Sequence, residues 1–216
     1  LIHFDPQCNL SSSVGVSAES PSIYDALTGG TLPAGAIRST TVERLDIIPS
    51  TVDLAGATIE LVEERGRETF LKRVLSDLSE PYDFVFIDCP PSLGLLTVNG
   101  LVAADNVIVP LQCEYFAMEG LTQLLQSIKR VQTKLNPSLS LLGILFTMYD
   151  SRTRLAQDVV QEVVSYFGKR VFRTIIPRNV RLSEAPSHGV PINRYDPECV
   201  GAKSYQKLAE EVLSRV

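Results

Sequence analysis

The stretch Asp83-Phe84-Val85-Phe86-Ile87-Asp88-Cys89-Pro90-Pro91-Ser92 indicates the fold of this chain most directly. Residues that are mostly aromatic or β-branched lead into an acid, and two prolines then end the run. A continuous apolar run of this length is typical of a strand that is buried on both faces, as in a parallel sheet. The stretch therefore predicts a buried strand with Asp88 at its end, at the edge where open α/β sheets bind ligands.

Asp88 has two interpretations at this point. An acid that follows a hydrophobic strand often holds the magnesium of a nucleotide through water. The alternative is a structural acid that caps the next helix. The stretch alone does not separate these two roles, so the rest of the chain must decide between them.

The remaining apolar runs alternate with helical patterns along the 216 residues. This alternation predicts an α/β fold with a doubly wound, mostly parallel sheet and helices on both faces. We expect residues 1–216 to form a single domain. Residues 51–80 are expected to be mostly helical. Besides 83–88, strands are expected at residues 1–4, 45–48, 106–111, 141–147 and 171–176.

Composition restricts the possible functions. No stretch approaches the ~20 apolar residues of a membrane span, and no secretory signal is recognisable. The 4 cysteines have no metal-binding spacing, which favours reduced thiols in a cytoplasmic protein, and the 2 histidines lie far apart. Because the net charge is −5, any binding of nucleic acid must use a local basic patch.

Other acids follow predicted strands. Asp5 comes just after the first strand, so we expect it at the same sheet edge as Asp88. Two acids at adjacent strand ends can serve one metal–phosphate centre, one holding water on magnesium and one orienting the attacking water. Asp150 follows the strand at 141–147, and the segment 176–181 follows the strand at 171–176.

Five segments together resemble the ParA/Soj family of partition ATPases. They are FDPQCNLSSSVGV (4–16), DFVFIDCPPSLGLLTVNGL (83–101), VPLQCEYFAMEGLTQLL (109–125), LLGILFTMYDSRT (141–153) and IIPRNVRLSEAPSHGVPI (175–192). The resemblance covers nearly the whole chain in the family's order. It implies a P-loop NTPase-like ATPase of the deviant Walker A type that binds ATP and Mg²⁺ and forms a homodimer around ATP. It also implies nonspecific DNA binding, stimulation by a ParB-like partner, and segregation of chromosomes or plasmids from a cytoplasmic, nucleoid-associated location.

The resemblance assigns roles near the phosphates by position. Asp88 matches the Walker B acid, which contacts magnesium through water. Asp5 matches the switch I acid that supports hydrolysis, and Gln7 continues that switch. Pro90 and Pro91 match switch II, which would sense the γ-phosphate.

The resemblance also assigns residues near the base and the DNA. Met148 and Asp150 match the segment near the adenine. The loop that packs against the base from the other side is matched by Pro177, Arg178 and Asn179. For DNA, Arg178 and Arg181 are expected one helical turn apart. Scattered arginines usually form a solvated face, but the family implies phosphate contacts for this pair.

The chain departs from the family in one respect near the phosphates. No segment of these residues matches the family's Gly-rich phosphate loop. In the family this loop, with the first strand and the P-loop helix, precedes the strand at 1–4 in a unit of roughly 30 residues. It supplies backbone N–H groups and lysines for the phosphates. We therefore expect these residues alone to bind ATP poorly or not at all, and to be inactive without that segment.

The other departure is His3. The family usually reads Asp-x-Asp-Pro-Gln where this chain reads His3-Phe4-Asp5-Pro6-Gln7, so a histidine replaces an acid near the magnesium. A neutral imidazole can still accept a hydrogen bond from metal-bound water, but it supplies no negative charge. His3 is thus a weak candidate for the metal site, and it indicates either weaker magnesium binding or a decaying or mis-sequenced end.

Two other functions are considered. A MinD-like cell-division regulator would end in a basic amphipathic membrane helix, whereas the last residues, 210–216, have no basic face. A catalytically inactive ParA remnant would keep the fold without hydrolysis. A KGGxGKT-like run within about 40 residues before Leu1 would favour the enzyme over the remnant.

Overall fold

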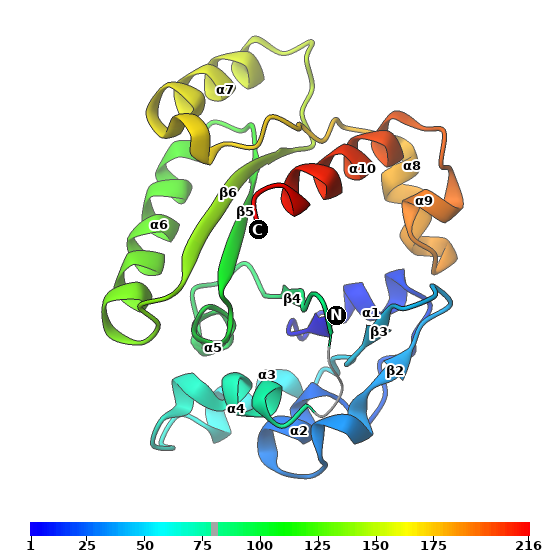
Figure 1. The fold of residues 1–216 in the computed structure, drawn as a ribbon, viewed down its shortest axis with the longest axis vertical. Coiled ribbons are helices and arrows are strands. Elements are labelled where there is room, and N and C mark those ends of the chain that lie inside the picture. Colours follow the sequence, from blue (N-terminus) through cyan, green and yellow to red (C-terminus); the bar gives the residue numbers. More distant parts are fainter. Residues whose placement is uncertain (79–81) are drawn as a thin grey trace.

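The computed structural model describes residues 1–78 and 82–216 (Figure 1). The strands are β1 (Ile2–His3), β2 (Arg38–Ser39), β3 (Asp46–Ile47), β4 (Ile87–Asp88), β5 (Asn106–Gln112) and β6 (Ser140–Thr147). The helices are α1 (Asn9–Ser13), α2 (Ile23–Thr28), α3 (Leu54–Glu60), α4 (Phe70–Ser76), α5 (Leu95–Ala103), α6 (Ala117–Lys134), α7 (Arg154–Phe167), α8 (Val180–Glu184), α9 (Ile192–Tyr195) and α10 (Val200–Leu213). Short 3₁₀ turns are η1 (Pro33–Ala36), η2 (Arg67–Thr69), η3 (Gly168–Arg170) and η4 (Ala185–His188). Of the predicted helical stretch 51–80, residues 79 and 80 lie outside the described residues.

The parallel strands and their covering helices confirm the predicted α/β class. The hydrogen bonds between strands, however, form three separate pairs rather than one continuous sheet. β1 and β4 are parallel, with His3 opposite Asp88, and β5 and β6 are parallel over their whole lengths. β2 and β3 are antiparallel, and the end of β3 continues toward β1 through a parallel bridge between Ile2 and Ile48.

The strand predicted at 83–88 is much shorter than expected. Only Ile87 and Asp88 are in β4, and the side chains of Phe84, Val85 and Phe86 are 46%, 42% and 53% exposed. The prediction of a strand buried on both faces is therefore wrong. An apolar run is buried only where neighbours cover it, and in the described parts of the chain β4 pairs with a strand on one edge only, that of β1.

The strand predicted at 171–176 is also wrong, for a different reason. This segment meets β6 in a single parallel bridge, between Ile144 and Val171. The backbone N–H groups of Arg173 and Thr174 donate to the Glu211 carboxylate, at 2.9 Å each. A side chain of α10 has thus taken donors that a longer ladder would need.

The core contains two large apolar clusters that share α5, and a smaller cluster around Phe172 and Leu208. One cluster surrounds β5 and β6 and includes apolar faces of α6 and α7, and the other joins β1 to α2, α3 and α4. α5 contributes Val102 to the first cluster and Leu96 to the second. Figure 1 shows α6 and α7 beside the β5–β6 pair, and α10 on its other side. None of the described helices is long and apolar enough to cross a membrane.

Candidate nucleotide site

The register of β1 against β4 brings the two expected acids to one edge. The Phe4 N–H group donates to the Asp88 carbonyl at 2.8 Å, which continues the ladder just beyond His3. Asp5 then follows Phe4, so both acids leave the ends of paired parallel strands. Burial raises the pKa of the Asp88 carboxyl, and the nearby negative charge of Asp5 raises it further. The expected proximity of Asp5 and Asp88 is therefore confirmed.

The chain turns sharply after Asp5. One carboxylate oxygen of Asp5 accepts the Gln7 N–H group at 2.9 Å, and its carbonyl accepts the Cys8 N–H group at 3.2 Å. Aspartate commonly bonds the backbone two residues on in this way. Cys8 adopts a left-handed backbone, with φ of 58°, and its thiol donates to the Ser50 carbonyl. The turn leads into α1 and leaves the side chain of Gln7 exposed.

His3 lies under this turn and is completely buried. Its Nδ1 atom accepts the Ser11 N–H group at 3.1 Å, with the Ser11 hydroxyl 2.8 Å away. Because a backbone N–H can only donate, Nδ1 carries no hydrogen, and the proton of the neutral ring is on Nε2. Nε2 is therefore a donor, not the acceptor for a metal-bound water that the sequence suggested. Burial also lowers the pKa of His3.

Asp88 is the last residue of β4, just before the segment that leads to α5. Its side chain is 52% exposed, and the His3 Nε2 atom is 3.9 Å from one of its oxygens. Behind it, burial raises the pKa of the Cys89 thiol to about 12, so the thiol is neutral and inert. A Cβ atom at Gly100 would lie 2.4 Å from the Cys89 sulfur, so only glycine lets α5 pack this closely.

The two prolines follow directly. The Thr97 hydroxyl donates to the Pro90 carbonyl at 3.2 Å, which ties this segment to α5. Pro90 is half-buried and Pro91 is exposed. Their assignment to switch II, including contact with a γ-phosphate, stays a prediction.

A second group of candidate residues surrounds the end of β6. A parallel bridge joins Tyr149 to Pro177, and the Arg178 N–H group donates to the Tyr149 carbonyl at 3.0 Å. The segments 148–150 and 177–179 therefore lie side by side, as two walls of a base pocket would. Met148 is 46% exposed and has a left-handed backbone, with φ of 51°.

The Asp150 carboxylate is engaged within this group. Arg152 donates to both of its oxygens, at 2.9 and 2.7 Å. These bonds, together with the Arg152 N–H group, hold the pKa of Asp150 well below its usual range. Within residues 1–78 and 82–216, no recorded hydrogen bond or ion pair joins this group to His3, Asp5 or Asp88.

The two arginines predicted to bind DNA differ in their surroundings. Helix α8 begins at Val180, after the N-cap Asn179, whose side chain accepts the Arg181 N–H group at 2.9 Å. Arg178 therefore precedes the helix, and the prediction that the pair are one helical turn apart is wrong. Arg181 forms ion pairs with Glu184 at 2.8 Å and with Asp196 at 3.3 Å.

Arg178, by contrast, is exposed. No ion pair is recorded for its guanidinium among the residues that the structure describes. Of the two arginines, Arg178 is the one whose charge is available to a phosphate.

The acids at the β1–β4 edge fit a magnesium nucleotide better than a metal alone. Among the described residues, no group of three or more His, Cys, Asp and Glu side chains could hold a metal ion. Magnesium usually keeps several waters and uses one or two carboxylates together with the phosphates of the substrate. The exposed carboxylate of Asp88, with Asp5 beside it, provides that kind of incomplete site.

Sequence reasoning missed two partners in these groups. Ser11, which fixes the proton of His3, belongs to the polar run that follows Asp5 in the sequence. Arg152 is two residues from Asp150, a spacing that could have indicated the ion pair. The clustering of polar residues after a strand was the available signal in both cases.

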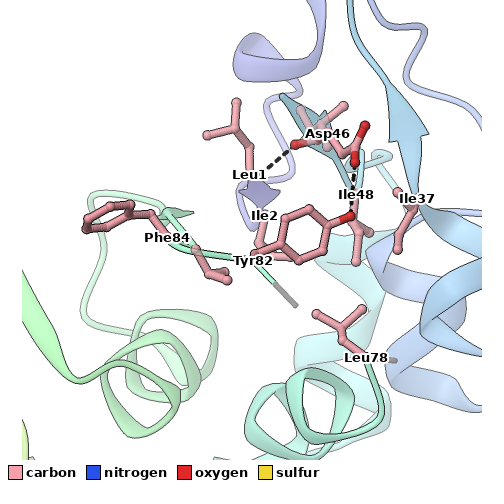
Figure 2. Close-up of a pocket in the computed structure, with 10 residues that line it drawn as sticks. Leu1, Ile2, Ile37, Asp46, Ile48, Leu78, Tyr82 and Phe84 are labelled. Carbon is pink, nitrogen blue, oxygen red and sulfur yellow. Dashed lines mark hydrogen bonds between the residues drawn. The ribbon is translucent and has the colours of Figure 1, made fainter. Parts of the chain in front are cut away.

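An apolar hollow lies at the beginning of the same strands, away from the acids (Figure 2). It is lined mainly by aliphatic and aromatic side chains. Asp46 is the acid in its lining, and it is engaged. Its carbonyl accepts the Leu1 amino group at 2.6 Å, and its carboxylate accepts the Tyr82 hydroxyl at 3.0 Å.

Comparisons with known proteins show which family the chain resembles. The family profile described as an AAA domain matches residues 1–141. The chain is 58% identical over 215 residues to the chromosome-partitioning ATPase Soj of Treponema pallidum, covering 100% of this chain and 85% of that protein. It is 51% identical over 216 residues to the sporulation initiation inhibitor protein Soj of Bacillus subtilis, covering 99% and 85%.

A solved structure extends the comparison to bound ligands. The crystal structure described as cobyrinic acid a,c-diamide synthase from Mycobacterium smegmatis, with bound ADP and magnesium, is 40% identical. It superimposes with a TM-score of 0.84 over 98% of this chain and 80% of that one. Its described activity differs from that of the Soj proteins, which have higher identity to this chain. The chain belongs to the ParA/Soj family of chromosome-partitioning ATPases.

Proposed function

We propose that this protein binds ATP with magnesium at the β1–β4 edge and hydrolyses it. The observation that carries the proposal is the convergence of Asp5 and Asp88 at the ends of paired parallel strands. Asp88 would hold magnesium through water, and Asp5 would orient the attacking water. The ion, when bound, neutralises charge on the phosphates. Gln7, Pro90 and Pro91, which flank the two acids, would face the phosphates.

The adenine would lie between the segments at 148–150 and 177–179. Their adjacency through the Tyr149–Pro177 bridge supports this placement. Met148 would contact the base from one side, and Pro177 and Asn179 from the other. Because Arg152 already binds the Asp150 carboxylate, we propose that Asp150 shapes the pocket through Arg152 and its backbone.

We further propose a role in partitioning, with residues 1–216 belonging to a single ATPase domain. The identity to the chromosome-partitioning ATPase Soj supports this role. The protein would form a homodimer around ATP, bind DNA without sequence preference and be stimulated by a ParB-like partner. It would act in the cytoplasm, on the nucleoid. The cargo would be a chromosome or a plasmid.

Hydrolysis is tested by substitution in the intact protein, with any residues encoded ahead of Leu1 included. We expect Asp5→Asn to lower ATP turnover by about 100-fold or more while ATP still binds, because orienting water contributes to the chemical step. We expect Asp88→Asn to abolish the magnesium dependence of binding. Asp83→Asn is the matched control, since Asp83 is 83% exposed and its ion pair among the described residues is with an equally exposed arginine. Equal turnover in all three variants would refute the proposal.

DNA binding is tested by its dependence on salt. Arg178→Ala should weaken binding equally for unrelated sequences and reduce the slope of log affinity against log salt by about 1. Arg44→Ala is the control, because Arg44 is 83% exposed and lies far from Arg178 in the sequence. Tight, salt-insensitive binding to one sequence would contradict the proposed mode.

One observation favours the alternative of a catalytically inactive protein. The family's acid is absent at position 3, where His3 is buried instead. Turnover by the wild-type protein decides between the two proposals, because an inactive remnant would bind nucleotide without releasing phosphate.

A further inference from the structure

His3 has an unusual environment for a histidine. The side chain is fully buried, and its Nε2 atom has no hydrogen-bond partner in the described structure. Buried polar groups are almost always paired, so an unpaired donor requires an explanation. The ring is fixed from the other side, because Nδ1 accepts the Ser11 N–H group and has the Ser11 hydroxyl 2.8 Å away. The Nε2–H group is therefore held in one direction.

That direction is toward Asp88. Nε2 is 3.9 Å from an Asp88 carboxylate oxygen, which is about 1 Å longer than a hydrogen bond. The Asp88 side chain is 52% exposed, and no other hydrogen bond or ion pair to its carboxylate is recorded in the described parts of the chain. A small rotation of this carboxylate is therefore enough to complete the bond.

We propose that His3 is a positioning residue whose buried Nε2–H group donates to Asp88 and orients its carboxylate for magnesium. This inference rests on the proposed function, in which Asp88 contacts the ion through water. Carboxylates at metal sites are commonly held by such outer hydrogen bonds, and losing one typically costs 10–100-fold in metal affinity or activity. His3 thus replaces the charge of the family's acid with a hydrogen bond to the acid that remains.

Two substitutions at His3 distinguish the roles of its two ring nitrogens. In His3→Asn, the side-chain oxygen takes the position of Nδ1 and can accept the Ser11 N–H group. No atom of asparagine reaches the position of Nε2. In His3→Gln, the amide nitrogen can reach the place of Nε2 and donate to Asp88. Ser11→Ala is the matched control, because it removes a buried hydroxyl but keeps the N–H group that fixes the proton of His3.

The first measurement needs no nucleotide. The ¹⁵N spectrum of the histidine rings distinguishes protonated from unprotonated nitrogens, and the chain has only 2 histidines. Signals lost in His3→Asn identify His3. We expect Nε2 protonated and Nδ1 unprotonated at neutral pH in the wild-type protein and in Ser11→Ala. A protonated Nδ1 in the wild-type protein would overturn the inference.

The second measurement is the magnesium concentration that gives half-maximal ATP turnover. We expect His3→Asn to raise it by about 10-fold or more, and His3→Gln and Ser11→Ala to change it by less than about 3-fold. Equal values for His3→Asn and His3→Gln would overturn the inference, even if both variants are less stable to heat. If the wild-type protein shows no magnesium-dependent turnover, the proposed function fails, and this inference fails with it.

A third measurement covers the case in which His3→Asn does not fold. In the wild-type protein, the Nε2 proton signal should move when magnesium and ADP are added, because the hydrogen bond to Asp88 closes. No movement in a protein that demonstrably binds the nucleotide would refute the role of His3 and leave the proposed function standing.

Discussion

Glu211 anchors the last helix to the rest of the molecule, and replacing it tests how strongly. Its carboxylate accepts the N–H groups of Arg173 and Thr174 at 2.9 Å each and the Arg215 guanidinium at 2.7 Å. Arg215 in turn donates to the carbonyls of Leu142 and Val171. Three donors thus meet one carboxylate that is 15% exposed.

The stabilisation of the fold by ionised Glu211 can be worked out from the pKa of this residue. Burial raises this pKa, but the backbone donors and Arg215 more than offset burial and lower it from 4.5 to about 2. Each pKa unit corresponds to about 1.4 kcal/mol, so ionised Glu211 stabilises the fold by about 3 kcal/mol at pH 7. Because the folded-state pKa is depressed, this stability is present above pH 4.5 and is lost as the pH falls toward 2. About 1.5 kcal/mol of it remains at pH 3.

The substitution is Glu211→Gln, which has the shape of the protonated acid. We expect it to lower the free energy of unfolding in urea by about 3 kcal/mol at pH 7 and by roughly half of that at pH 3. Glu210→Gln is the control, because Glu210 is exposed and next to Glu211 on α10. A loss below about 0.5 kcal/mol at pH 7, or a loss that does not change with pH, would refute this account.

Three further substitutions test how the segments pack. Gly15 has a φ of 73°, and a Cβ atom there would lie 2.9 Å from the Gly189 carbonyl oxygen, so Gly15→Ala should lower the free energy of unfolding by about 1–2 kcal/mol. Gly120→Ala, in an exposed position of α6 with nothing within 4 Å, should instead raise it by about 0.5–1 kcal/mol, and equal effects would contradict the prediction. Asn136 is buried and donates to three backbone carbonyls at the end of α5. Asn136→Ala should therefore lower the free energy of unfolding in urea by about 1–3 kcal/mol. A neutral result would show that water replaces the amide.

The sequence predicted the fold well where its pattern has a local cause. The strands at 106–111 and 141–147 are present in full, because each finds the other as a parallel partner along its whole length. The helices α5, α6 and α7 alternate with these strands, as predicted. These elements bury apolar residues in the core, so a local pattern is enough to indicate each of them.

The prediction failed where pairing depends on distant residues. The apolar run at 84–86 indicates a strand, but its burial depends on neighbours on both edges, and among the described residues β4 has one at only one edge. The segment at 171–176 has strand-like residues, yet Glu211, almost 40 positions later, takes two of its backbone donors. A local pattern contains no information about such competition.

The candidate site shows the same division. The sequence by itself determined that Asp5 and Asp88 are acids at the ends of strands, because an apolar run and the turn after it are local features. Only the tertiary structure decided what His3 does there. The proton of its ring is set by Ser11, and its Nε2 atom lies 3.9 Å from Asp88, on a strand more than 80 residues away. Such distant residues come together only once the chain has folded, which is why the sequence alone did not indicate the proposed role of His3 as a donor to Asp88.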